Sequence, residues 1–159
     1  MISQNINILL ADDDETDCLL FKEALEELPV SAHLTIVHNG EQVIEELTKK
    51  GKKLPDVLFL DLNMPRKNGF VALGEIKRSI KLQDLPVIIF STSSESGAIK
   101  NVYRDAAHYY ICKPVDFSQL KRAIYEALTL ITQEYNPLPL EKNFMITGDS
   151  IIIPDNNES

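Results

Sequence analysis

The regular alternation of short apolar runs with amphipathic segments is the feature that most constrains the fold of this chain. Five runs have the length of strands, and the segments that follow them carry apolar residues at helical spacing. The expected strands cover 5–11, 33–37, 57–60, 87–90 and 109–111, and the expected helices cover 15–28, 41–50, 70–80, 94–106 and 117–133. This alternation predicts an α/β protein with a parallel sheet covered by helices on both faces.

The middle runs indicate how the sheet is wound. The runs at 57–60 and 87–90 are apolar at every position, which is typical of strands buried on both faces. Crossover connections between parallel strands are right-handed, so few strand orders remain. The simplest is a doubly wound, five-stranded, flavodoxin-like sheet of order 2-1-3-4-5. In such a sheet the functional crevice lies beyond the carboxyl ends of the strands, where the order reverses.

Composition excludes several classes of function. The 159 residues include 24 acidic and 16 basic side chains, for a formal net charge of −8, which argues against binding to nucleic acid. No apolar run is long enough to span a bilayer, and the N-terminus does not resemble a signal peptide. Cys18 and Cys112 are expected to be small buried side chains in a reducing compartment. We therefore expect a soluble cytoplasmic protein without nucleic-acid or membrane partners.

Polar residues at the expected element boundaries predict helix caps. Asn39, with Gln42 three residues later, resembles a capping box, and Asp116 is placed to cap the last helix. Asp14 and Glu15 have an ordinary explanation as cap and first-turn residues of the first helix.

The pattern ends at residue 136. Asn136-Pro137-Leu138-Pro139 cannot extend the last helix, and the apolar runs on either side of Gly148-Asp149 predict a hairpin. An isolated hairpin is marginally stable, so this one should pack on another part of the protein. Residues 155–159 predict a disordered end. We therefore divide the chain into a domain at 1–135 and an extension at 136–159.

Polar residues that could carry chemistry follow four of the expected strands. Asp12 and Asp13 follow the first strand, Asp61 the third, Ser91 the fourth and Lys113 the fifth. The predicted strand order brings the three carboxylates to one place, where their repulsion calls for a cation. An oxygen-only cluster suits Mg²⁺, and a nearby ammonium and hydroxyl would complete a cradle for a phosphoryl group. The pattern indicates phosphoryl transfer, although each residue alone has a structural explanation.

Five motifs in this order resemble the receiver domain of bacterial two-component response regulators, over about residues 5–133. Leu9-Leu10-Ala11-Asp12-Asp13 is similar to the family's acidic pair, and the segment from Leu60 to Gly69 is similar to its phosphoacceptor segment, with Asp61 as acceptor. Phe90-Ser91-Thr92 matches the hydroxyl position at Ser91. Tyr110 stands at the aromatic switch position, and Lys113-Pro114 matches a lysine followed by a cis proline.

The resemblance implies a signalling protein that catalyses only its own phosphorylation and dephosphorylation. Asp61 would accept a phosphoryl group from a sensor histidine kinase or a histidine phosphotransfer protein. The resemblance further implies that Mg²⁺ is coordinated by Asp13, Asp61 and the backbone carbonyl of Asn63, with Asp12 acting through water. Lys113 and Ser91 would bind phosphoryl oxygens, Ser91 and Tyr110 would form the switch, and a cis bond would precede Pro114. The alternative for Tyr110 is a buried core aromatic that has no switching role.

Only residues 136–159 follow the receiver-like region, so the resemblance implies a stand-alone regulator without a DNA-binding domain. The extension is weakly similar to the tails of receivers that serve phytochrome-type kinases. We expect it to pack along a dimer or partner face. The family's precedent is a homodimer through the fourth helix, the fifth strand and the fifth helix.

Two alternatives stay open from the sequence. Asp12-Asp13-Asp14-Glu15-Thr16 also fits the nucleophile motif of haloacid-dehalogenase-type phosphatases, with Asp12 as nucleophile and with Ser91, Lys113 and the Gly148-Asp149 pair as further motifs. That scheme leaves the segment around Asp61 unexplained. The other alternative is an interaction scaffold with a vestigial site.

Overall fold

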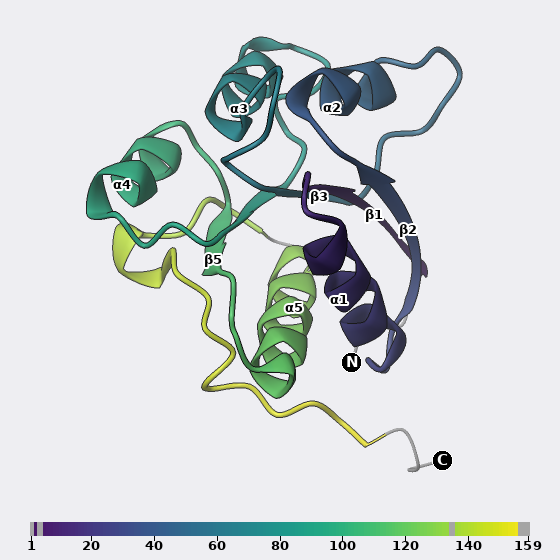
Figure 1. The fold of residues 1–159 in the computed structure, drawn as a ribbon, viewed down its shortest axis with the longest axis vertical. Coiled ribbons are helices and arrows are strands. Elements are labelled where there is room, and N and C mark those ends of the chain that lie inside the picture. The colour runs from purple at the N-terminus through teal and green to yellow at the C-terminus, as the bar shows by residue number, and fades with distance from the viewer. Residues whose placement is uncertain (1, 3–4, 134–135, 156–159) are drawn as a thin grey trace.

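The structure is a computed structural model that describes residues 2, 5–133 and 136–155, and strands and helices alternate along it (Figure 1). The strands are β1 (Asn5–Ala11), β2 (Ser31–Val37), β3 (Val57–Leu60), β4 (Val87–Ser91) and β5 (Tyr109–Cys112). The helices are α1 (Glu15–Glu26), α2 (Gly40–Leu47), α3 (Gly69–Arg78), α4 (Ser96–Arg104) and α5 (Phe117–Ile131), and the 3-10 turn η1 covers Glu141–Asn143. Every strand and helix predicted for residues 5–133 is present.

The strands form one parallel sheet in the order β2-β1-β3-β4-β5, which confirms the predicted fold. The order reverses at β1, which lies between β2 and β3. Ala11, the last residue of β1, is the register partner of Leu60, the last residue of β3. The residues that follow these strands therefore leave the sheet side by side.

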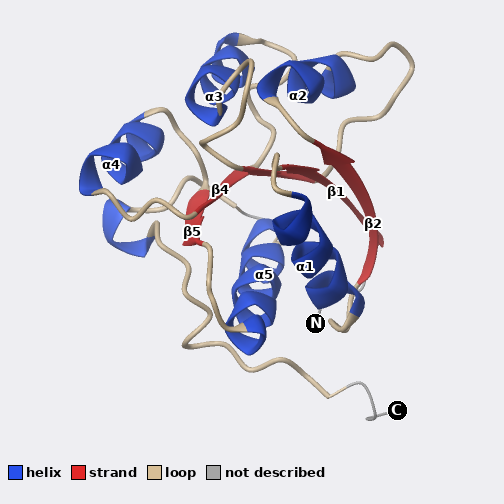
Figure 2. Cartoon of the chain, viewed as in Figure 1, coloured by secondary structure: helices blue, strands red, loops and turns tan. Residues whose placement is uncertain are grey.

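The helices cover both faces of the sheet, α1 and α5 on one and α2, α3 and α4 on the other (Figure 2). Phe21 of α1 packs edge-on against Phe59 of β3 and Phe90 of β4, with ring centroids 4.9 and 5.6 Å away. Burial of each such ring contributes roughly 1.5–3 kcal/mol. Among the described helices, none combines the length and apolarity needed to cross a membrane.

The predicted caps are present. The side chains of Asn39 and Asp116 accept hydrogen bonds from the backbone N–H groups of Gln42 and Gln119, at 2.9 and 3.0 Å. The capping box differs in one detail, because the side chain of Gln42 accepts from the backbone of His38, one residue before the cap. The helices end a few residues earlier than predicted. In α2 the helical conformation ends at Thr48, whose φ of −108° and ψ of 6° lie outside the helical region.

The predicted hairpin at the C-terminus is wrong. The backbone N–H of Tyr110 in β5 donates to Phe144 O at 3.0 Å, and Ile146 N–H donates to Tyr110 O at 2.9 Å. The segment therefore pairs with the open edge of β5 and not with itself, because Phe144 and Ile146 bury their side chains against the sheet there. Of the expected disordered end, residues 156–159 lie outside the described residues.

The predicted cis bond before Pro114 is also wrong, because the described residues contain no cis peptide bond. Trans is the intrinsically favoured isomer of an X–Pro bond. The trans backbone still lets Lys113 N–H donate to Ser91 O at 2.8 Å, so the end of β5 stays joined to the end of β4.

His108 makes the stability of the fold depend on pH. Its ring lies buried just before β5 and accepts a hydrogen bond from Val87 N–H through Nδ1 at 3.4 Å. Burial and the positive charge of Lys77 lower the pKa of His108 from 6.5 to about 4. In the unfolded chain His108 therefore binds a proton below pH 6.5, whereas in the folded chain it binds one only below about pH 4. The contribution to stability is complete above pH 6.5 and is lost as the pH falls through this window.

We expect the free energy of unfolding to fall by about 2 kcal/mol more in the wild type than in His108→Gln between pH 7.5 and pH 5. Denaturant unfolding at the two pH values measures the difference. His33→Gln is the matched control, because His33 is exposed on β2. Equal losses in wild type and His108→Gln would contradict the assignment.

Candidate functional site

Three carboxylates meet where the strand order reverses. Asp12 follows β1 and Asp61 follows β3, and each of Asp12, Asp13 and Asp61 has a carboxylate oxygen within 4.8 Å of the others. Asp12 is fully buried and Asp61 is 5% exposed, whereas Asp13 is exposed to solvent. The predicted convergence of these acids is confirmed.

The backbone fixes the positions of the two buried acids. Asp12 N–H donates to Val37 O of β2, and Asp61 N–H donates to Ala11 O of β1, both at 3.0 Å. The chain after Asp61 turns back closely, because Gly69 N–H donates to Leu62 O at 3.0 Å. A side chain at Gly69 would collide with Asp61 O, so glycine is required at this close approach.

Lys113 lies among these acids. Its Nζ is 2.7 Å from Asp12 Oδ2, 2.8 Å from Asp17 Oδ2 and 3.5 Å from Asp61 Oδ2. The predicted position of Lys113 beside Asp12 and Asp61 is confirmed. The sequence interpretation missed Asp17. Asp14 accepts a hydrogen bond from Asp17 N–H, so Asp17 lies in the first turn of α1, and this cap-plus-three spacing was the available signal.

Burial and charge shift the pKa values of this group in opposite directions. Burial, helped by the negative charge of Asp12 and opposed by Lys113, raises the pKa of Asp61 to about 6. For Lys113, burial alone would lower the pKa, but the close negative charge of Asp12 and the hydrogen bond to Asp17 outweigh it and hold the pKa above its ordinary value. Beneath them, burial next to Asp12 raises the pKa of the Cys18 thiol to about 12, so this cysteine stays protonated.

The side chains of Ser91 and Tyr110 both form hydrogen bonds with the backbone of the same loop residue, Ser93. Ser91 is buried at the end of β4, whereas Thr92 is exposed, and the functional role of the Ser91 hydroxyl stays a prediction. Ser91 Oγ accepts from Ser93 N–H at 3.2 Å, and Tyr110 Oη donates to Ser93 O at 2.7 Å. Ser93, which the sequence interpretation passed over, therefore connects the two side chains.

The donor set fits a hard divalent cation. Asp12, Asp13 and Asp61 offer only oxygen ligands, and the exposure of Asp13 leaves room for water. The buried Oδ2 of Asp12 accepts no well-aligned hydrogen bond, although Lys113 Nζ lies 2.7 Å away. These properties suit Mg²⁺, which keeps several waters when it binds to carboxylates. Asn63 N–H lies 3.4 Å from Asp61 Oδ1, and the use of the Asn63 carbonyl as a ligand stays a prediction.

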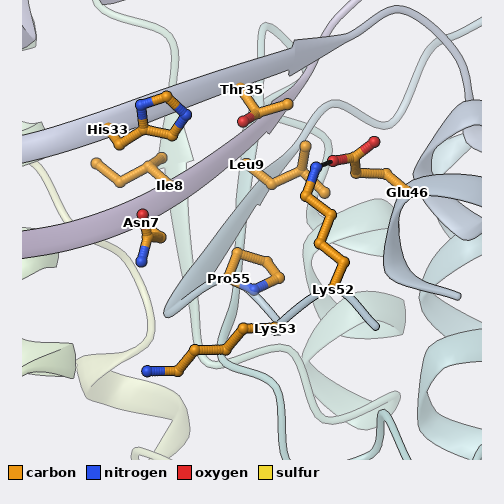
Figure 3. A pocket seen from close by; sticks show the side chains of 9 residues that line it. All are labelled: Asn7, Ile8, Leu9, His33, Thr35, Glu46, Lys52, Lys53 and Pro55. Atoms are coloured by element: carbon orange, nitrogen blue, oxygen red, sulfur yellow. Dashed lines mark hydrogen bonds and ion pairs between the residues drawn. The ribbon is translucent and has the colours of Figure 1, made fainter. Parts of the chain in front are cut away.

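A cavity of about 230 Å³ lies elsewhere, toward the amino ends of β1 and β3 (Figure 3). Ile8, Leu9 and Pro55 form part of its lining, and its acid, Glu46, pairs with Lys52. Glu46 is the one acid among the residues that line this cavity, so the cavity does not offer a cluster of carboxylates like the one described above.

Comparison with known proteins identifies a family. The family model described as the response regulator receiver domain matches residues 8–125. The probable methanogenesis regulatory protein FilR2 of Methanothrix harundinacea is 30% identical over 122 residues, which cover 75% of this chain and 79% of that protein.

Solved structures agree with this match. The phosphorylated cyanobacterial phytochrome response regulator RcpA superimposes with a TM-score of 0.75 at 30% identity, over 86% of this chain and 100% of RcpA. The Mn²⁺-bound response regulator Rcp1 has a TM-score of 0.73 at 26% identity, over 85% of this chain and 99% of Rcp1. Rcp1 comes from Synechocystis.

The phosphatase alternative is not supported, because the family match and the structural neighbours are response regulators. The geometry also disfavours it. Asp149 of the Gly148-Asp149 pair accepts a hydrogen bond from Gln119 at the start of α5. The pair therefore does not follow a strand of the main sheet, as the phosphatase scheme would need.

Charge compensation by Lys113 can be tested by removing it. We expect Lys113→Ala to lower the free energy of unfolding by about 3 kcal/mol in the presence of a chelator, because it leaves buried carboxylates without a counter-charge. Asp12→Asn, introduced into Lys113→Ala, should restore most of the loss.

Lys121→Ala is the matched control. Lys121 pairs at 3.3 Å with Glu27, whose side chain is 56% exposed, so its removal should cost less than about 1 kcal/mol. Denaturant titration of the wild type, Lys113→Ala, the double variant and Lys121→Ala measures these effects. Similar losses for both lysines would show that Lys113 does not compensate the acids.

Proposed function

Because the chain belongs to the family of response regulator receiver domains, we propose that Asp61 accepts a phosphoryl group from a phosphohistidine of a partner protein. A carboxylate oxygen of Asp61 attacks the phosphorus, the bond between phosphorus and the histidine nitrogen breaks, and the histidine leaves with that electron pair and takes up a proton. The product is an acyl phosphate on Asp61. The observation that carries the proposal is the position of Asp61 beside Lys113 and two further carboxylates.

The contacts of the acids favour Asp61 over Asp12 as the nucleophile. Asp12 Oδ1 accepts from Asp14 N–H at 3.0 Å, and Asp12 Oδ2 pairs with Lys113 at 2.7 Å. Both oxygens of Asp12 are therefore engaged. Asp61 Oδ2 is 3.5 Å from Lys113, which leaves this oxygen the more available of the two to attack.

The remaining residues have supporting roles in this proposal. Asp12, Asp13 and Asp61 would hold Mg²⁺, which when bound supplies neutralisation of the carboxylates and polarisation of phosphoryl oxygens. Lys113 pairs with one phosphoryl oxygen, and the hydroxyl of Ser91 donates to another. Tyr110 follows the movement of Ser91 through Ser93, which turns a local charge change into a change at β5.

Receiver domains interact with histidine kinases and phosphotransfer proteins, and we propose such a donor here. The likeness to RcpA, a phytochrome response regulator, favours a phytochrome-type kinase. Val115, two residues after Lys113, is a fully exposed apolar side chain. A donor that presents its phosphohistidine to Asp61 would cover it. A homodimer through α4, β5 and α5 stays a prediction.

We expect Asp61→Asn to abolish labelling by a small phosphodonor or a phosphorylated phosphotransfer protein, because the amide is a poor nucleophile. Asp12→Asn should slow labelling and leave the label at Asp61, which intact-mass and peptide analysis would locate. Asp84→Asn is the control, since Asp84 is exposed near the amino end of β4. Label that survives in Asp61→Asn and disappears in Asp12→Asn would contradict the assignment of Asp61 as the phosphoacceptor.

Magnesium binding has a readout that needs no phosphodonor. At about 100 times its dissociation constant, Mg²⁺ should stabilise the wild type by about 2.7 kcal/mol, because it binds only the folded protein. Asp13→Asn should lose most of this stabilisation. Asp14→Asn is the control, because asparagine can replace the N-cap of α1 without changing the three acids. Thermal unfolding with and without Mg²⁺ measures both, and equal stabilisation of Asp13→Asn and wild type would contradict the site.

A further inference from the structure

The open edge of β5 is covered by the chain's own C-terminal segment, residues 139–149, which we term the strap. It runs beside β5 and α4 before it reaches α5 (yellow in Figure 1). On α4, Tyr103 Oη donates to Pro139 O at 3.2 Å. On α5, Gln119 Nε2 donates to Thr147 O and to Asp149 Oδ1. The strap therefore lies across the face formed by α4, β5 and α5.

The centre of the strap is fastened to Tyr110. Both backbone groups of Tyr110 pair with it, one with Phe144 O and the other with Ile146 N–H. The ring of Phe144 is 1% exposed and packs against the rings of Tyr103 and Tyr110, with centroids 5.1 and 6.2 Å away. Ile146 is buried in the core on the other side of the sheet. The strap thus contributes to both cores of the protein.

The far end of the strap fits closely against α5. Gly148 has a φ of +78°, and a Cβ at this position would lie 2.6 Å from Ala123 N. Only glycine meets both the positive φ and the close approach. This fit shows a specific docking of the strap on α5.

A chain of contacts connects the strap to the phosphoryl site. The hydroxyl of Ser91 bonds to Ser93 N–H, Ser93 O accepts from Tyr110 Oη, and the backbone and ring of Tyr110 contact Phe144. Tyr110 is thus held at its hydroxyl by the loop after β4 and at its backbone by the strap.

We propose that the strap is a phosphorylation-responsive cover of the α4–β5–α5 face, an inference that rests on the proposed function of Asp61. When the hydroxyl of Ser91 donates a hydrogen bond to a phosphoryl oxygen, the loop after β4 moves. Tyr110 Oη then loses its acceptor, the carbonyl oxygen of Ser93. A buried hydroxyl without a partner is unfavourable, so the ring of Tyr110 shifts. The shift removes part of the surface on which Phe144 packs, and the hold of the strap on β5 weakens.

Linkage makes the proposal reciprocal. If phosphorylation weakens the docking of the strap, weaker docking must favour the phosphorylated state by the same factor. A variant with a loosened strap should therefore bind a phosphoryl analogue more tightly.

Amide hydrogen exchange in the full chain, followed by NMR with and without beryllofluoride and Mg²⁺, tests the first half. The amides of Tyr110 and Ile146 donate the hydrogen bonds between strap and strand, so we expect their exchange to accelerate about tenfold or more. The amide of Asp56, bonded to Asn7 O at the other end of the sheet, is the internal control and should not change. Beryllofluoride that binds without changing the Tyr110 and Ile146 amides would overturn the strap proposal while leaving the function of Asp61 intact. Failure of beryllofluoride to bind at all would refute the proposed function itself.

Variants test the second half. Phe144→Leu keeps an apolar side chain but loses the ring contacts, and we expect it to bind beryllofluoride several-fold more tightly. Met145→Leu is the matched control, because Met145 is 40% exposed in the same segment. Tyr110→Phe removes only the hydroxyl and should abolish the effect of beryllofluoride on the Ile146 amide. Equal affinities of Phe144→Leu and wild type, or an unchanged response in Tyr110→Phe, would count against the proposal.

Discussion

The ion pairs of Lys113 with buried carboxylates are the interaction on which the rest of the site depends. One ammonium contacts Asp12, Asp17 and Asp61, and Asp13 stands beside them, so the local charge is strongly negative. The parallel sheet imposes this arrangement, since it places the residues after β1, β3 and β5 at one edge. The excess negative charge that destabilises the folded protein also favours the binding of a divalent cation there. Stability and chemistry therefore oppose each other at the same residues.

The fold and most of the site could be predicted from the sequence because both follow from local patterns. Apolar periodicity identified each strand and helix, and the residues after the strands identified Asp12, Asp61, Ser91 and Lys113. Asp17 was missed because a residue of a helix was not expected to contact the strand ends. Its contact with Lys113 depends on how α1 starts at its Asp14 cap.

The C-terminus could not be predicted, because its structure depends on tertiary context. A glycine between two apolar runs indicates a hairpin when only local sequence is considered, and Gly148 does have the positive φ of a turn. The open edge of β5 offered a better partner, since Tyr110 had both backbone groups available to pair. Phe144 and Ile146 also bury their side chains in the two cores, one on each face of the sheet. Burial decided the outcome over local turn preference.

An open edge strand is a template for pairing with another chain, and the strap removes this liability at β5. The same contact sets the terms for any partner that uses the α4–β5–α5 face. Such a partner must compete with the docked strap, so its apparent affinity is reduced by the fraction of molecules in which the strap is docked. Under the proposed mechanism, that fraction depends on the phosphorylation of Asp61, because Tyr110 contacts both the strap and the loop after Ser91. Protection of the edge and regulation of the face are then two consequences of one set of contacts.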